Sequence, residues 1–548
     1  MGRCSHTDDF GRKMIEQSIR REVETACSNL YGLEPQVEFV IEREGRFGDL
    51  TTNVAFSLSK TLKKSPHEIA SKIADRVRKV PLFERVEVGG DGFLNFYLKR
   101  QTLCDELKEI FSRAETYGSL TVGKRERVLI EFVSANPTGP LLVVNARAAA
   151  IGDSLARTMN FAGYHAESEY YVNDAGHQVE LLAQSVVARY HELLGETGQL
   201  PEQGYRGEYV RALAQELLEK KVPLSSVREY VLERIVKQQA ETLDAFRVSF
   251  DHWVRESEIR GRMKEVETSL VKRNAAYMSD GALWLASSRF GDEKDRVLVK
   301  RTGEPTYVLP DLAYHSHKFS RGFNRLINIW GPDHHGYISR IKAGMEALGY
   351  PPERLQILIA QQVNLIRGGE KIMMSRREGE FITMAQLLDD VGVDAARFFF
   401  LLRRNSSHLD FDVDLARKTS QDNPVYYVQY GHARISSIMR YAEQSGVDLD
   451  LISRFQSDRL MEEEELSLIK SLMLFPAVVQ RVSSTLDPHS IPYYLMDLAT
   501  VFHNFYQKHR VVSDDRDLTL ARLALVETTR AAVNNGLRLI GVSAPLEM

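Results

Sequence analysis

The sequence is short of cysteine, of long apolar runs and of any large excess of one charge. Its only three cysteines have no metal-ligand spacing and are too few for a disulfide framework: Cys4, Cys27 and Cys104. Such sparse cysteine usage favours a reducing compartment. We therefore expect a cytoplasmic protein.

No stretch approaches the about 18 consecutive apolar residues that a membrane-spanning helix needs. The first ten residues, MGRCSHTDDF, contain no apolar signal segment. We therefore expect neither a membrane span nor secretion. The formal net charge is only −4, so the average field does not attract a polyanion, and a nucleic acid would have to be bound by local basic patches.

The composition that is present, 43% hydrophobic and 27% charged residues without low-complexity tracts, is that of a globular protein and argues against disorder. A chain of 548 residues is too long for one hydrophobic core, and domain sizes suggest about three to four domains.

Three regions with different patterns follow one another. Residues 1–118 combine helical apolar spacing with two short strands, RVEVGG and GFLNFYL, and Pro66 marks a helix start, so we expect a small α+β domain. Residues 119–414 are α/β, with a charged, Leu-rich helical insertion near 176–251. Residues 415–548 are helical without strand signals, which predicts an all-α domain.

The central region opens like a nucleotide-binding domain. The apolar strand RVLIEFVS runs into NPTGP and then into an Ala-rich helix that we expect to begin near Asn145. ESEYYVND reads as the next strand. After the insertion, apolar strands return in VLVKRTGEPTYVLP, LINIWGPDHHGY and LQILIAQQVNLI, consistent with one parallel sheet that resumes.

Nine segments in order carry a family resemblance. They are FGDLTTNVAF, GDGFLNFYL, SANPTGP, YYVNDAGHQ, SDGALW, PTYVLPDLAYHSHKF, WGPDHHGY, DNPVYYVQYGHARI and GLRLIGVSAPLEM. Together with VGVDAARFFFLLRRNSSHLDFDVDLA they resemble the class I arginyl-tRNA synthetases over essentially the whole chain. Each segment is weak evidence alone, but their order and spacing make coincidence very improbable.

The resemblance implies a fold and an activity. It implies an N-terminal tRNA-binding domain (1–118), a Rossmann-like catalytic domain (119–414) and a helical anticodon-binding domain (415–548). The implied reaction joins arginine to ATP, releases pyrophosphate, and transfers the arginyl group to the 3′-terminal ribose of tRNA(Arg), commonly with tRNA required for activation. ATP would act with Mg²⁺ and without a protein-ligated metal, and the protein would be a monomer.

The arginine pocket should offer carboxylates and further acceptors, because a guanidinium is a planar cation with five donors. The resemblance implies Asp311 as the guanidinium partner, and Glu131 and Asn136 as partners of the amino group. Taken alone, either acidic residue could instead cap or solvate the end of a strand. The full implied set is Glu131, Asn136, Tyr307, Asp311 and Gln361.

The nucleotide site is indicated by Gly331, Pro332 and Asp333 after the strand INIW. A glycine there lets the backbone approach a ribose, and the carboxylate can accept from its hydroxyls. The neighbouring His334 and His335 point apart without a third ligand nearby, so a structural or nucleotide role is favoured over a metal. The implied ATP-binding set is Pro137, Thr138, Gly139, Gly331, Asp333, His334 and Met374.

The first phosphate signature departs from the family pattern. Where the family has His-x-Gly-His-Gly-x-Gly, residues 142–148 read Leu-Val-Val-Asn-Ala-Arg-Ala. Leu142 cannot donate a hydrogen bond, and Val144 adds bulk where the nucleotide approaches. Loss of one such donor costs about a hundredfold in rate. Asn145 can still donate as a neutral amide and is a good N-cap, and the helix N-terminus still attracts an anion.

The second signature, Lys-Met-Ser-Lys-Arg in the family, reads Met373-Met374-Ser375-Arg376-Arg377. Arg376 keeps a cation in place of the second lysine, and Lys371 could replace the first only with a register shift. The implied catalytic residues are Asn145, Ser375 and Arg376. Without the resemblance, this basic segment would read as a solvated loop.

Aromatic residues from Tyr426 to His432 recur at helical spacing, and their faces suit stacking on anticodon bases, although core packing is an alternative. The chain ends in Glu547-Met548, where the family has an arginine before the terminal methionine. The implied tRNA-binding set is Asn53, Phe93, Asn95, Tyr426, Gln429, Tyr430 and Met548.

Three functions remain open at this point. The first is an arginine-tRNA ligase, favoured by the whole-chain resemblance. The second is a non-catalytic paralogue that serves as a tRNA- or arginine-binding module, favoured by the altered phosphate signature. The third is an unrelated nucleotidyltransferase, which would explain the sheet but not the two flanking domains.

Overall fold

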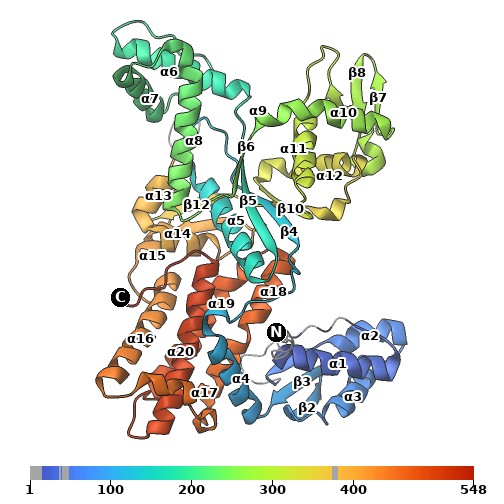
Figure 1. The fold of residues 1–548 in the computed structure, drawn as a ribbon, viewed down its shortest axis with the longest axis vertical. Coiled ribbons are helices and arrows are strands. Elements are labelled where there is room, and N and C mark those ends of the chain that lie inside the picture. The colour runs from blue at the N-terminus through green and yellow to red at the C-terminus, as the bar shows by residue number, and fades with distance from the viewer. Residues whose placement is uncertain (1–14, 36, 38, 40–47, 373–380) are drawn as a thin grey trace, which may run out of the picture.

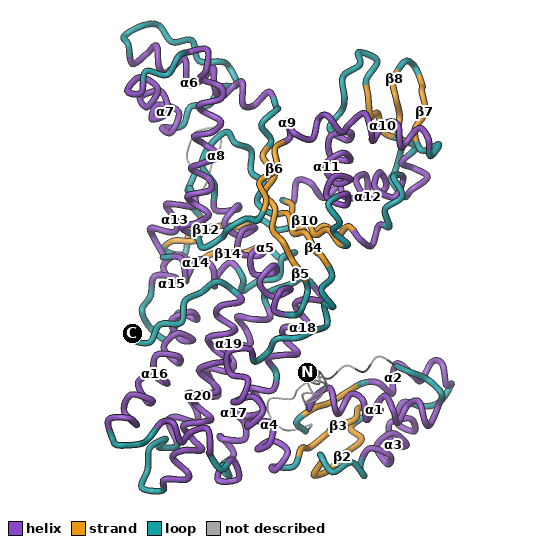
Figure 2. Tube along the Cα trace, in the orientation of Figure 1, coloured by secondary structure: helices purple, strands orange, loops and turns teal. Residues whose placement is uncertain are grey.

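The computed structural model describes residues 15–35, 37, 39, 48–372 and 381–548. A parallel sheet lies at the centre, with helical lobes above it, a long helical body below it, and the N-terminal body at the lower right (Figure 1). Figure 2 shows that strands are confined to the centre, the N-terminal body and one upper lobe.

The N-terminal body packs helices on a three-stranded antiparallel sheet of order β1-β3-β2. Its elements are α1 (Ile15–Tyr31), β1 (Leu50–Thr52), α2 (Val54–Leu62), α3 (Pro66–Val77), β2 (Phe83–Gly89), β3 (Phe93–Leu98) and α4 (Arg100–Arg113). Pro66 opens α3 as predicted, and the hydroxyl of Ser65 caps it by accepting from the Glu68 N–H at 3.2 Å.

The central sheet is parallel throughout, with the order β11-β10-β4-β5-β6. Its elements are β4 (Arg127–Glu131), α5 (Val143–Phe161), β5 (His165–Val172), β6 (His252–Arg255), β10 (Arg325–Trp330) and β11 (Leu355–Ile359). The chain proceeds from β4 to β5 and β6 on one side, and later adds β10 and β11 on the other. The order therefore reverses between β4 and β10, and sheets of this kind bind ligands at the carboxyl ends of the strands at that point.

Two helical lobes interrupt the sheet. The first consists of α6 (His177–Leu193), α7 (Glu208–Lys220) and α8 (Val227–Ala245). The second contains α9 (Glu256–Ile259), α10 (Met263–Lys272), β7 (Ala276–Ser279), β8 (Ala282–Leu285), β9 (Arg296–Val299) and α11 (Val308–Ser320), and α12 (Ile338–Ala347) packs on α11.

The expectation that all returning strands rejoin the parallel sheet was wrong for two of them. β9 pairs antiparallel with β8. β12 (Val363–Arg367) forms a separate sheet with β13 (Glu370–Lys371) and β14 (Leu409–Asp412). An apolar run identifies a strand, but its partners are set by contacts far away in the sequence.

The C-terminal part is helical: α13 (Met384–Val391), α14 (Val393–Phe400), α15 (Val413–Arg417), α16 (Pro424–Gln444), α17 (Glu463–Met473), α18 (Phe475–Thr485), α19 (Ser490–Lys508) and α20 (Arg516–Leu539). The stretch 463–485 is long and apolar enough to cross a membrane, with a mean hydropathy of 1.3. It is divided at Leu474 into two helices, which pack on α19 and α5. Length and composition alone do not distinguish a span from such core helices.

The N-terminal and helical bodies are joined directly. Lys470 of α17 forms an ion pair with the buried carboxylate of Asp49 at 2.6 Å. The Tyr117 hydroxyl donates to the Leu472 carbonyl at 2.7 Å. α4 packs against α17 and α20, and apolar side chains continue from the N-terminal body through α5 into the helical body as one core.

Candidate functional site

A buried ion pair lies at the carboxyl end of β4. Glu131, the last residue of that strand, pairs with the fully buried Lys318 of α11 and accepts from the Ser134 hydroxyl at 2.9 Å. Burial is the largest single influence and favours the neutral acid, but the nearby charge of Lys318 and the hydrogen bonds from Lys318 and Ser134 act together against it, and the pKa of Glu131 is lowered. Lys318 also donates to Asn328 at 3.3 Å. Glu131 is therefore a fixed carboxylate at the predicted crevice.

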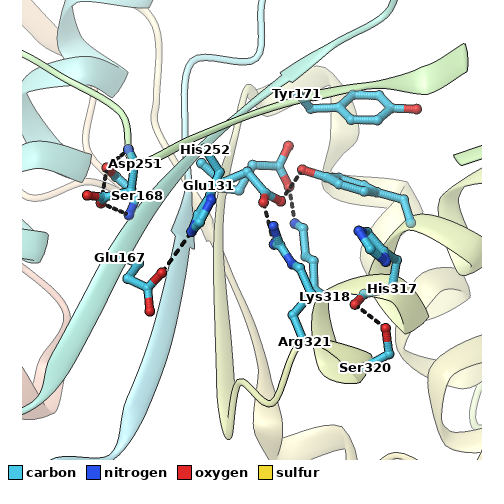
Figure 3. A network of polar contacts seen from close by, with 12 residues as sticks. Glu131, Glu167, Ser168, Tyr171, Asp251, His252, His317, Lys318, Ser320 and Arg321 are labelled. Carbon is cyan, nitrogen blue, oxygen red and sulfur yellow. Dashed lines mark hydrogen bonds and ion pairs between the residues drawn. The ribbon is translucent and has the colours of Figure 1, made fainter. Parts of the chain in front are cut away.

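A second carboxylate lies beside the first. Glu169 of β5 is fully buried, pairs with Arg321, and accepts from the Tyr314 hydroxyl at 2.7 Å. Figure 3 shows Glu131 and the side chains of Lys318 and Arg321 converging from the sheet and from α11. Each acidic group is thus balanced by a cation from another element, which is the arrangement that a buried charge requires.

Asp311, in the first turn of α11, is held differently. Its carboxyl accepts from the Tyr337 hydroxyl at 2.6 Å, and no cation pairs with it among the described residues. Burial raises its pKa to about 7, and the nearby charge of Glu131 adds to this rise. A cationic partner would therefore stabilise the ionised form of Asp311.

The ring of His315, one turn after Asp311 on α11, is held by hydrogen bonds on both of its nitrogens. Its Nδ1 lies 2.7 Å from the Asp311 carbonyl, and its Nε2 accepts from the Asn328 amide at 2.7 Å. Burial, reinforced by Lys318, lowers the pKa of His315 to about 4, so the ring is neutral and Nδ1 donates. Tyr307, just before α11, is by contrast 88% exposed.

The loop after β4 is strained and clamped. Val133 and Ser134 have φ of 67° and 38°, and a β-branched residue is strongly disfavoured there. The buried Gln239 of α8 donates to the carbonyls of Asn136 at 3.2 Å and Gly139 at 2.9 Å. The Tyr209 hydroxyl donates to the Thr138 carbonyl at 2.8 Å. The first helical lobe thus holds this loop in shape.

The side chains of this loop differ in exposure. Asn136 is exposed and donates to Gln178 at 2.8 Å. Pro137 is buried, and Thr138 and Gly139 are half-buried. Gln361, the other predicted arginine-site side chain, is half-buried in the turn before β12, where its N–H donates to the Asn405 carbonyl at 3.0 Å.

The predicted phosphate side is the N-terminus of α5. The expectation that this helix begins at Asn145 with that residue as its N-cap was wrong: it begins at Val143, and Leu142 is the N-cap. Asn145 is the third helical residue, and its carboxamide oxygen accepts from the Leu142 N–H at 2.8 Å. This is half of a capping box, which explains an asparagine one turn inside the helix.

The segment that follows the second signature lies against the first signature at the N-terminus of α5. Leu142 forms an isolated antiparallel bridge with Thr383, and the Met384 N–H donates to the Leu141 carbonyl at 2.7 Å. The second signature itself, Met373, Met374, Ser375, Arg376 and Arg377, lies outside the described residues.

The predicted nucleotide residues follow β10. Gly331 lies at the strand end, and a Cβ there would come within 2.9 Å of Asp333 Oδ1. Asp333 and His334 are exposed on the 3₁₀ turn Pro332–Tyr337. Within the described ranges, no group of three His, Cys, Asp or Glu residues is arranged to hold a metal ion.

The predicted RNA residues of the N-terminal body fall into two groups. Asn53 is exposed, and Phe93 is 44% exposed with its ring 5.0 Å from that of Phe56. Asn95 is buried and accepts from the Thr51 hydroxyl at 2.7 Å. Only the first group faces outward.

The same division occurs on α16. The Tyr426 and Tyr430 rings are stacked at 6.3 Å, and Arg434 lies 5.1 Å from the Tyr430 ring centre. Gln429 is buried and donates to Asp394 at 2.9 Å and to the Ser543 carbonyl at 3.0 Å. The two stacked tyrosines are thus half-buried, whereas Gln429 is buried and ties the helix to the C-terminal segment. Met548 is 52% exposed.

Sequence reasoning missed the buried cations Lys318 and Arg147 and the half-buried Arg321. Lys318 follows Asp311 and His315 at i+7 and i+3, so helical spacing alone would have placed all three on one face.

Comparisons with known proteins agree with this geometry. The profile described as "tRNA synthetases class I (R), catalytic domain" matches residues 106–407. An M. tuberculosis methionyl-tRNA synthetase structure, 12% identical, shares the fold with a TM-score of 0.52 over 76% of this chain and 92% of its own. The sheet order and the profile together define a class I aminoacyl-tRNA synthetase.

The flanking regions and the relatives specify the family. "Arginyl tRNA synthetase N terminal domain" matches residues 13–98, and "DALR anticodon binding domain" matches 428–548. An arginine-tRNA ligase of Carboxydothermus hydrogenoformans is 44% identical over 97% of this chain and 98% of its own. One of Bacillus subtilis is 43% identical over 94% and 95%. The Thermus thermophilus arginyl-tRNA synthetase structure, 23% identical, has a TM-score of 0.81 over 98% of this chain and all of its own.

The chain belongs to the arginyl-tRNA synthetase family. The predicted resemblance and the predicted fold class are confirmed.

Proposed function

We propose that this protein is an arginine-tRNA ligase that activates arginine with ATP and transfers it to tRNA(Arg). One observation carries the proposal: at the point where the strand order reverses, Glu131 is held ionised by Lys318, and the half-buried carboxyl of Asp311 has, among the described residues, only the Tyr337 hydroxyl as its partner. A crevice with an unbalanced carboxyl beside a fixed carboxylate suits a substrate that carries both a guanidinium and an ammonium group.

In this proposal Asp311 binds the guanidinium, since a cation would restore its charge. Glu131 and Asn136 bind the amino group, and Glu131 still has lone pairs beyond those used by Lys318 and Ser134. Tyr307 and Gln361 complete the arginine set. Tyr307 is so exposed that it would close over bound substrate, not hold an empty pocket.

ATP lies across the opposite wall, with its ribose at Gly331 and Asp333 and its remaining contacts from Pro137, Thr138, Gly139, His334 and Met374. Mg²⁺ accompanies the phosphates and needs no protein-ligated site. Asn145, Ser375 and Arg376 assist the phosphates. The Asn145 carboxamide oxygen is already bonded, so its NH₂ group is the part that can donate.

Three domains divide the work: 1–118 and 415–548 bind tRNA, and 119–414 catalyses. The exposed Asn53, Phe93 and Met548, and the half-buried stacked pair Tyr426 and Tyr430, support RNA contacts. Asn95 and Gln429 act by shaping the surfaces, because both are buried. We place the protein in the cytoplasm as a monomer, and its described cysteines, Cys27 and Cys104, are buried and free.

The test is aminoacylation by purified protein with ATP, radiolabelled arginine and total tRNA, because the family commonly needs tRNA for activation. Charging of tRNA by the wild type is expected. The absence of charging, with arginine and tRNA binding still measurable, would reject the ligase and leave a binding paralogue. That second function is favoured only by Leu142 and Val144 in the phosphate signature.

A further inference from the structure

Arg147 is a fully buried guanidinium on α5, five residues after Leu142. Its Nη1 donates to the Gln361 carbonyl at 2.9 Å and, less closely, to that of Gln362 at 3.5 Å. Its Nη2 donates to the Arg404 carbonyl at 2.9 Å. One side chain therefore holds two chain segments that lie more than 200 residues further along the sequence.

The charge of Arg147 is poorly balanced. No carboxylate of the described residues pairs with it, and its Nε has no hydrogen-bond partner there. Burial lowers its pKa to about 10, which the charge of Asp487 opposes only in part. The equally buried Arg397 also donates to two carbonyls but is paired with Asp153. A cation satisfied by carbonyls alone costs stability, so Arg147 is a poor choice for packing as such.

Arg147 connects the two halves of the site. The helix that carries Arg147, α5, begins at the phosphate signature, one turn before Arg147. The turn that it grips carries Gln361, and that turn is held on its other side by bonds from Ala360 N–H to the Trp330 carbonyl at 2.9 Å and from Gln361 N–H to Asn405. Arg147 is thus the hydrogen-bonded link between the phosphate end of α5 and the turn with Gln361.

We propose that Arg147 is a positioning residue that sets the separation of the arginine and phosphate halves of the crevice. The inference rests on the proposed function. In the activation step a carboxylate oxygen of arginine bonds to the α-phosphorus of ATP, while the bond to pyrophosphate breaks and pyrophosphate leaves with the electron pair. Displacements of about 1 Å in such an alignment cost about a hundredfold.

The test compares Arg147→Lys and Arg147→Met with Arg397→Lys as the matched buried control. Three dissociation constants are measured in the presence of total tRNA: for arginine, for ATP, and for a non-hydrolysable arginyl-sulfamoyl-adenosine. Only the joined analogue must fill both halves at their correct separation. We expect its affinity loss in the Arg147 variants to exceed the product of the two separate losses by about tenfold or more.

Arg397→Lys should lower the melting temperature without any such excess. A loss for the analogue that equals the product of the separate losses would overturn the positioning role, as would a change in melting temperature alone. Arg147→Lys keeps the charge but loses the forked guanidinium that reaches both segments, so it remains informative if Arg147→Met does not fold. If the wild type binds the analogue but does not charge tRNA, the ligase proposal fails while this comparison still decides the role of Arg147. A wild type that does not bind the analogue rejects both.

Discussion

The proposed crevice lies at the carboxyl ends of β4 and β10, and its two sides are built in different ways. On the arginine side, Glu131 and Glu169 are buried and each is paired with a cation from α11 or its end. On the phosphate side, Leu142 and Val144 are half-buried at a helix end, while the packing is carried by the buried Val143 and Ala146. The two carboxylates of the arginine side are therefore held in the interior, whereas the signature side chains Leu142 and Val144 are not.

This difference indicates which substitutions lower the stability of the fold and which do not. Replacing one member of a buried pair leaves an unpaired charge, so the arginine side can change only at a cost in stability. A side chain at the open end of α5 that contacts only ligand can be exchanged with little effect on folding. The altered signature thus bears on rate and says little about the integrity of the pocket.

The largest effect is expected from a substitution that breaks the buried ion pair on the arginine side. Lys318→Met leaves Glu131 buried without its cation, and should lower the free energy of unfolding by about 3–5 kcal/mol, measured by urea denaturation. Lys220→Met, which breaks the exposed pair with Glu216, is the control and should cost less than about 1 kcal/mol. Similar losses in both variants would show that the buried pair is not structural.

The next effect concerns the phosphate side. Restoring the signature with Leu142→His, Val144→Gly and Asn145→His together should raise the rate of tRNA charging by about a hundredfold, because donors for the developing phosphate charge return. The KM for arginine should stay constant. An unchanged rate would mean that other residues already stabilise the phosphates.

The KM for arginine should change about tenfold with pH, whereas the KM for ATP should not, and this difference distinguishes the two sides further. The folded-state pKa of Asp311 is raised to about 7, so its protonated form favours folding at low pH and this contribution is lost as pH rises through about 7. Arginine binding has the opposite sign because it needs the carboxylate. The KM for arginine should fall about tenfold from pH 6 to pH 8. Asp311→Asn should raise the KM and remove its pH dependence, whereas the KM for ATP should vary little.

The smallest effect lies outside the crevice. Tyr430→Ala removes one of the two stacked tyrosines on α16 and should weaken tRNA binding by about 1 kcal/mol, measured by filter binding. Tyr441→Ala, at an exposed tyrosine on the same helix, is the matched control. Equal losses would place the RNA elsewhere. The KM for arginine should not respond to either change.

Much of the fold could be predicted from local pattern. The strand that ends at Glu131, the helix that Pro66 opens and the all-α end all follow from periodicity and turn residues. The partners of β9 and β12 did not follow, since pairing depends on distant segments. The capping role of Asn145 was misplaced by one turn, because its side chain bonds back to the N-cap N–H from the third helical position.

The site could be predicted only in its outline. Motifs placed Glu131 and Asp311, but not the side chains that set their charge. Lys318 lies 187 residues from Glu131, and Arg147 lies 214 residues from Gln361, so neither pairing leaves a trace in local sequence. The inward position of Asn95 likewise depends on its cross-strand partner Thr51.

The joint between the N-terminal and helical bodies has a consequence for kinetics. Lys470 and Asp49, with the Tyr117 hydroxyl on Leu472, hold the proposed RNA surfaces of both bodies at one separation. Once an RNA touches either surface, it meets the other at a high effective concentration, but only if its own two contact points are equally far apart. If both surfaces bind RNA as proposed, an RNA whose contact points do not match this separation should gain no avidity and should dissociate quickly, whatever its local sequence.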